Sequence, residues 1–106
     1  MGTKQEKLGG LLKGLAAQFL QIESAGTSMI TVTDCRVSDN MRRALILITV
    51  LPEKGEEPAL NFVKRKRSDF KNYVKSKTRM QFIPFFDFAI DKGEKNRQHI
   101  DELLKM

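Results

Sequence analysis

The sequence predicts an α+β domain in which a three-stranded sheet packs on helices, with residues 1–106 forming a single domain. The chain is long enough for one hydrophobic core and too short for two. Its composition, 41% hydrophobic and 30% charged, is that of a globular protein and not of a disordered one. Apolar residues recur with a helical period in some segments and alternate in others, in the order helix, strand, strand, helix, helix, strand and short helix.

The first helix is expected over Gln5–Ile22, where apolar residues recur three or four positions apart and share one face. Gly9, Gly10 and Gly14 each weaken it by up to about 1 kcal/mol relative to alanine, so packing has to stabilise it. A membrane-binding helix is the alternative, but a face buried in a protein core is far commoner. No run in the chain approaches the roughly 20 apolar residues of a membrane span.

Two strands are expected next, after a turn at Glu23–Thr27. Met29–Val37 is rich in threonine and valine, but its apolar positions change phase, which predicts a β-bulge near Thr33 and Asp34. Arg43–Leu51 is apolar on both faces, which is typical of an inner or partly covered strand.

A pair of short helices is expected after Pro58, because proline suits the first turn of a helix. Ser68 and Asp69 are residue types typical of helix caps, so the two helices should meet near them. We expect Ser68 to cap the second helix or to mark the bend, and the second helix to end at Lys77 and Thr78.

The third strand is expected over Met80–Ile90, with Phe82, Phe86 and Phe88 on the face that the first helix covers. Pro84 lacks an N–H donor, which predicts an edge position or a bulge. A last short helix should follow a capping box and carry apolar residues on one face. The residues behind that prediction are Asp91, Glu94, Ile100, Leu103 and Leu104.

Positive charge is concentrated in one segment. Between Lys64 and Arg79 eight basic residues accompany one acid, Asp69, whereas the whole chain carries a net charge of +6. Such a concentration predicts a partner that carries phosphate groups. The candidate RNA-binding residues are Lys64, Arg65, Lys66, Arg67, Lys71, Lys75, Lys77 and Arg79.

Four of these residues form a row on a helix, because Lys64, Arg67, Lys71 and Lys75 are spaced by three, four and four positions. The apolar residues of the segment lie on another face, so the helices can pack on a core and present cations outward. A solvated face that binds nothing is the alternative. It is less expected here, because like charges four apart repel and we expect nothing nearby to neutralise them. The next candidate surface combines Arg42 and Arg43 with the N-terminal lysines.

Residue patterns typical of catalysis or metal binding are missing from the sequence. Cys35 is the only cysteine, which excludes an internal disulfide and a cysteine-cluster metal site and favours a buried position. His99 is the only histidine, and adjacent acids such as Glu56 and Glu57 point apart on a helix. We therefore expect no catalytic residue, no metal and no cofactor.

The expected order of elements is that of the type II KH fold. KH domains usually hold phosphates with a Gly-x-x-Gly loop between paired helices. The sequence has no such loop, and the basic helix pair occupies the corresponding place.

Short stretches along nearly the whole chain match, in register, the segments of one known family. Residues 30–33 and 37–41 match its first strand and the turn after it, and Leu60 and Asn61 lie where its second long helix starts. The other matching residues are Ala44, Ile46, Ile48, Arg79, Met80, Ile83, Pro84, Phe86, Phe88, Asp91, Ile100, Asp101, Leu103 and Leu104. On these residues the chain resembles the ribosome-binding factor A family, small bacterial proteins with a KH-like fold.

This resemblance implies a factor that binds the small ribosomal subunit and its rRNA. It implies a role in late maturation and rRNA 5′-end processing without catalysis, in a protein that is monomeric off the ribosome and has no membrane partner. We also expect a cytoplasmic protein, because the apolar residues near the N-terminus are periodic and mixed with Lys13 and Gln18, unlike the core of a signal peptide. The chain departs from the family at one place: family members carry an Ala-x-Gly bend between the paired helices, where this chain has Lys66, Arg67 and Ser68. Serine lacks the freedom of glycine at positive φ.

Two other functions stay open from the sequence. One is a KH-like module that binds RNA outside the ribosome, and the other is a protein-interaction domain whose basic face meets an acidic protein.

Overall fold

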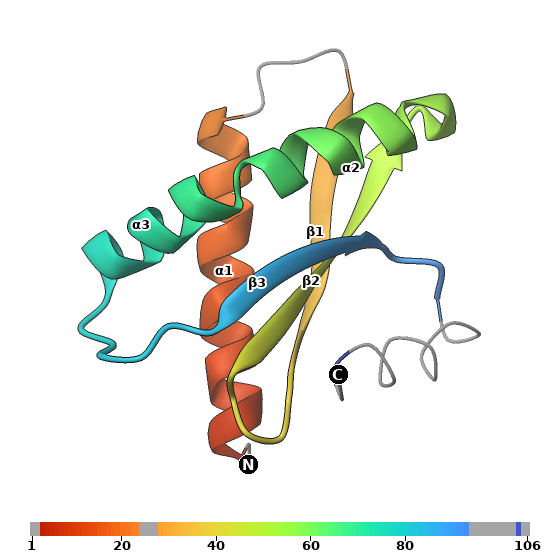
Figure 1. Cartoon of the computed structure of the whole chain (residues 1–106). Helices are drawn as coiled ribbons and strands as arrows, with labels where there is room; N and C mark the ends of the chain where they lie inside the picture. Colours follow the sequence, from red (N-terminus) through yellow and green to blue (C-terminus); the bar gives the residue numbers. More distant parts are fainter. Residues whose placement is uncertain (1–2, 24–27, 94–103, 105–106) are drawn as a thin grey trace.

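The structure, a computed structural model, describes residues 3–23, 28–93 and Leu104. The order of its elements follows the sequence prediction (Figure 1). The helices and strands are α1 (Lys4–Glu23), β1 (Met29–Val37), β2 (Arg43–Leu51), the short 3₁₀ helix η1 (Glu53–Gly55), α2 (Glu56–Arg65), α3 (Arg67–Lys77) and β3 (Phe85–Ile90).

The strands form one sheet in the order β1-β2-β3, so the almost wholly apolar β2 is the inner strand, as predicted. β1 and β2 pair antiparallel as a hairpin, and the predicted bulge lies between Val32 and Asp34. β3 pairs parallel to β2, with Arg43 opposite Phe85. A parallel pair needs a long crossover connection, and η1, α2, α3 and the segment after them supply it.

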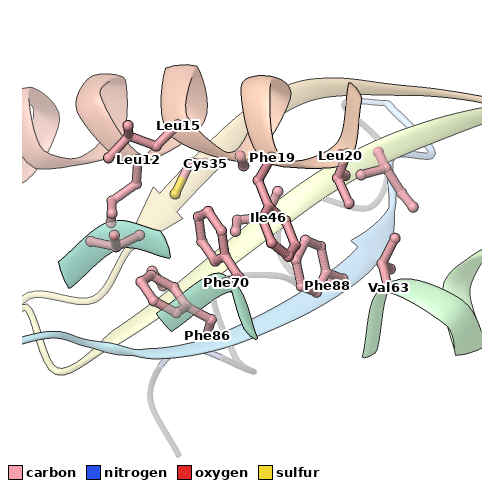
Figure 2. Packing of buried hydrophobic residues seen from close by; sticks show 14 of the residues in the cluster. Leu12, Leu15, Phe19, Leu20, Cys35, Ile46, Val63, Phe70, Phe86 and Phe88 are labelled. Atoms are coloured by element: carbon pink, nitrogen blue, oxygen red, sulfur yellow. The ribbon is translucent and has the colours of Figure 1, made fainter. Parts of the chain in front are cut away.

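The hydrophobic core lies between the three helices and one face of the sheet (Figure 2). β2 contributes alternate residues to this face, from Ala44 to Val50, because side chains along a strand point to opposite sides. The ring of Phe70 on α3 is at the centre of an aromatic cluster. Its centroid lies 5.3 Å from that of Phe19 on α1, 4.6 Å from that of Phe86 and 6.3 Å from that of Phe88. Phe70 therefore joins α1 and α3 to β3.

Gly9 weakens α1, but its place against β1 requires a residue without a side chain. A Cβ atom at this position would lie only 2.9 Å from the backbone oxygen of Cys35. The helix therefore approaches β1 more closely than a residue with a side chain would allow, and the cost in helix propensity is offset by packing against the sheet.

The opposite face of the sheet carries a smaller apolar cluster of Leu45 and Leu47, packed by Ala89 and Leu104. Leu104 is helical, as the last predicted helix requires. The other residues of that prediction from Glu94 on lie outside the described residues, as do residues 24–27 of the predicted turn. The predicted capping box pairs Asp91 with Glu94, which lies outside the described residues. The Asp91 carboxylate accepts hydrogen bonds from the Thr33 hydroxyl at 2.6 Å and from the Gly93 N–H at 2.9 Å.

The third strand is shorter than predicted, because it begins at Phe85 and not at Met80. Pro84 is fully buried and cannot donate to a ladder, and strand pairing starts just after it, where the Phe85 N–H donates to the Arg42 carbonyl at 2.8 Å. The alternation of β3 therefore does not extend back to Phe82. Phe82 is 61% exposed, so its predicted place in the core was wrong, whereas Phe86 and Phe88 are buried as predicted.

The predicted pair of helices is present, but their junction is Lys66 and not Ser68. The Lys66 N–H donates to the Val63 carbonyl, and the Lys66 carbonyl accepts from Phe70, so one residue ends α2 and begins α3. Ser68 lies in the first turn of α3 and does not cap it. The φ of Lys66 is −94°, an ordinary value, so the bend needs no glycine.

Phe86→Ala is expected to lower the free energy of unfolding by about 3–5 kcal/mol, because it leaves a cavity beside Phe70. Phe85 supplies the control variant, because it is 55% exposed whereas its neighbour Phe86 is 3% exposed. Phe85→Ala should therefore cost less than about 1 kcal/mol. Urea denaturation of both variants measures the two values. Equal losses would show that β3 faces the helices differently.

Candidate nucleic-acid interface

The predicted basic row is partly neutralised by an acid from β3. The Lys64 Nζ lies 4.0 Å from Asp87 Oδ1, and Arg67 Nη1 lies 3.4 Å from the same oxygen. The sequence did not indicate this pairing, because Asp87 is distant along the chain and reaches the row only through the fold. All three side chains are partly exposed, so each pair contributes little to stability.

Two of the predicted RNA-binding residues lie away from the row, on the side of α1. The Lys66 Nζ pairs with Glu23 on α1 at 3.5 Å and with Asp69 at 3.8 Å. Lys77 lies 5.5 Å from the ring centroid of Tyr73, whose hydroxyl donates to Gln18 on α1. Lys71 and Lys75 of the row are exposed, as are Arg65 and Arg79.

Two arginines outside the predicted segment join the row across an open hollow of about 780 Å³. α3 contributes residues to one wall, and the other lining residues come from the start of β2 with the residue before it and from residues 82–86, which lead into β3 and begin it. Ser68 also lines it. We call it the arginine–phenylalanine hollow and define it by Arg42, Arg43, Arg67, Lys71, Phe82 and Phe85. Part of each candidate surface of the sequence thus lies in one place: Arg67 and Lys71 of the row join Arg42 and Arg43, whereas the N-terminal lysines do not line the hollow.

Each arginine of the hollow lies over an aromatic ring. The Cζ of Arg42 is 5.8 Å from the ring centroid of Phe82. The Cζ atoms of Arg43 and Arg67 are 5.8 Å and 5.5 Å from the ring centroid of Phe85. These distances are typical of cation–π contacts, which orient the guanidinium groups.

The hollow combines two kinds of group that bind nucleic acids. Guanidinium and ammonium groups donate hydrogen bonds to phosphate oxygens, and exposed rings offer surfaces on which bases stack. The sequence signals were the adjacent pair Arg42 and Arg43 and the aromatic residues on both sides of Pro84. These residues are brought together by the pairing of β2 with β3, which are distant along the chain. No short sequence motif therefore indicates the site.

Groups suited to metal binding or covalent chemistry do not gather here. Among residues 3–23, 28–93 and Leu104, no three His, Cys, Asp or Glu side chains are placed to hold a metal ion. Cys35 is buried as predicted, and burial, reinforced by the charge of Asp34, raises the pKa of its thiol to about 12. His99, the only histidine of the sequence, lies outside the described residues. In the part of the chain that the structure describes, no helix is both long and apolar enough to cross a membrane.

The fold and the hollow together define a class: a small KH-like α+β domain that carries a basic surface with exposed aromatic rings. Comparison with protein families makes the assignment specific, since the model described as Ribosome-binding factor A matches residues 4–104. The chain therefore belongs to the ribosome-binding factor A family.

Individual relatives agree with this assignment. The chain is 29% identical over 104 residues to ribosome-binding factor A of Thermodesulfovibrio yellowstonii, which covers 96% of this chain and 88% of that protein. It is 25% identical over 107 residues to that of Natranaerobius thermophilus, covering 98% and 82%. The crystal structure of ribosome-binding factor A from Thermus thermophilus matches with a TM-score of 0.76 at 21% identity, over 85% of this chain and 98% of that one. The KH-like fold predicted from the sequence is confirmed.

The Cys35 thiol is expected to resist alkylation in the native protein. Its raised pKa leaves almost no thiolate at about pH 8, and reactivity should appear only as the pH approaches about 12 or when the protein unfolds. Iodoacetamide labelling followed by mass spectrometry, with and without urea, measures this. Fast labelling without urea would contradict the buried position of Cys35.

Proposed function

We propose that this chain is a ribosome biogenesis factor that binds the small ribosomal subunit through its rRNA. It assists late maturation and rRNA 5′-end processing without catalysing a reaction itself. It acts in the cytoplasm, as a single domain that is monomeric off the ribosome. The observation that carries the proposal is the union of Arg67 and Lys71 with Arg42 and Arg43 in one hollow, on a member of the ribosome-binding factor A family.

Phosphate binding follows from the electrostatics of the surface. The row and the hollow arginines carry more positive charge than the local acids remove, so a polyanion gains attraction and releases counterions when it binds. Asp87 pairs with Lys64 and Arg67 at the partly exposed edge, where such pairs are weak. A phosphate group can therefore compete with Asp87 for both cations.

Binding alone accounts for assistance in maturation. A protein that binds one rRNA conformation more tightly than another shifts the population toward the first, by an amount equal to the difference in binding free energy. A processing enzyme then meets the favoured conformation more often. This role requires a well-shaped basic surface and no catalytic group.

Sedimentation of the tagged protein with immature and mature small subunits tests the proposal. We expect it to sediment with small subunits, and more strongly with the immature ones. Competition with bulk RNA separates RNA binding from the binding of an acidic protein, because a phosphate-binding surface is titrated by RNA. Binding to bulk RNA without any sedimentation with subunits would support a non-ribosomal RNA partner instead.

Arg67→Glu combined with Lys71→Glu is expected to weaken subunit binding and its salt dependence. If the four residues of the row contact phosphates, the slope of log K against log salt is near −3 to −4, and losing two contacts flattens it by roughly 1.5. Lys54→Glu with Lys92→Glu is the control, since both lysines are exposed elsewhere and the net charge changes equally. Affinity measured between about 50 and 200 mM salt gives the slopes. Equal behaviour of the two double variants would contradict a specific role for the row.

Asp87→Asn is expected to strengthen RNA binding by up to about fivefold, the size of a surface ion-pair effect. It releases Lys64 and Arg67 and removes a charge that repels phosphate. Asp69→Asn is the matched control, because Asp69 pairs with Lys66 on the side of α1. Affinity for small subunits at low salt compares the two variants. An equal gain from both would show a general effect of net charge and not of the row.

A further inference from the structure

Two large aromatic side chains of the hollow are exposed to solvent. Phe82 is 61% exposed and Phe85 is 55% exposed. Large exposed apolar side chains that lie together often mark a binding surface. Their arginine neighbours stay on the surface too, so the two rings form a polar-rimmed aromatic surface and not an extension of the core.

The backbone holds both rings in place. Pro84 is fully buried and Ile83 packs against the core, so the two residues between the rings anchor the segment. Phe85 is fixed further by its hydrogen bond to the Arg42 carbonyl and by its register opposite Arg43. Because Ile83 and Pro84 are held inward, the two rings are preorganised on the outside, which lowers the entropy that a ligand must overcome.

We propose that the arginine–phenylalanine hollow binds an unpaired stretch of RNA, with bases stacked on Phe82 and Phe85. Arg42 and Arg43, which lie over these rings in the free protein, then turn to the phosphates of the same strand, together with Lys71. The inference rests on the proposed function only in taking RNA as the ligand, and it adds that the strand is single.

Chemistry favours a single strand over a duplex at this surface. The faces of paired bases are covered by their neighbours in a helix, whereas unpaired bases can be splayed and stacked on aromatic rings. A duplex would present only phosphates to this surface, and phosphates do not stack on aromatic rings. The carboxylate of Asp87 lies 3.4 Å from Arg67, so a phosphate has to compete with it for that guanidinium group, which favours a path of the strand over the exposed Lys71.

A peptide partner is the competing occupant, since β3 is at the edge of the sheet. The charge argues against it as the main ligand. Three arginines and a lysine line the hollow, and they match the regular negative charge of an RNA strand.

Fluorescence anisotropy with labelled octauridylate and with an RNA duplex of equal length tests the inference. We expect octauridylate to bind at least about fivefold more tightly than the duplex. Phe82→Leu and Phe85→Leu should each weaken octauridylate binding by about fivefold or more, since leucine keeps apolar volume but cannot stack. The salt slope should not change, because neither substitution alters charge. Phe85→Tyr should retain binding, and thermal melting checks that each variant folds.

Photocrosslinking gives a second readout that does not depend on affinity. Octauridylate with one 5-iodouridine should crosslink to the peptide that contains Phe82 and Phe85, and mass spectrometry locates the site. Equal binding of duplex and single strand, or parental binding by the double leucine variant, would overturn the inference. So would an absence of octauridylate binding, as a peptide-binding edge predicts.

Failure of this inference and failure of the proposed function are distinguishable. If the leucine variants bind octauridylate as the parent does, while Arg67→Glu with Lys71→Glu loses subunit binding, the stacking surface is wrong and the ribosomal function stands. If the leucine variants lose octauridylate but the parent does not sediment with small subunits, the single-strand site is right and the ribosomal assignment fails.

Discussion

Parallel pairing of β3 with β2 places Phe85 beside Arg43, and because side chains alternate along a strand it also turns Phe86 toward the helices. The core and the candidate interface therefore depend on the same register. A shift by one residue would exchange the two phenylalanines between core and solvent. It would also separate Asp87 from Lys64 and Arg67. Stability and surface chemistry are linked here through a single short strand.

The cationic side chains of the basic surface point in different, defined directions. Its cations divide between two sides of the helix pair, because Lys66 and Lys77 turn toward α1 while Arg67 turns toward β3. In the hollow the guanidinium groups lie over aromatic rings and Arg67 also pairs with Asp87, whereas on the α1 side Lys66 pairs with Glu23 and Asp69.

Local patterns predicted most of the fold. The bounds of β1 and β2 and the bulge near Asp34 follow from periodicity and residue type, and the structure has them as expected. The start of β3 was misplaced because Met80 and Phe82 continue the alternation by chance, and only the burial of Pro84 shows where pairing begins. The site was predicted in part. The sequence indicated the lysines and arginines of α2 and α3, but which of them face the hollow depends on contacts between distant segments.

The junction between α2 and α3 has a consequence for how such a domain can vary. Lys66 makes the bend with a φ of −94° and a ψ of 8°, and a negative φ does not require glycine. The side chain at this position can therefore change while the path of the backbone stays the same. In this chain the Lys66 side chain reaches Glu23 at the end of α1, so the junction between two helices also contacts a third. The path of the backbone at the junction therefore does not depend on the charge of the side chain there. A homologous chain can change the surface charge at this position and keep the same fold.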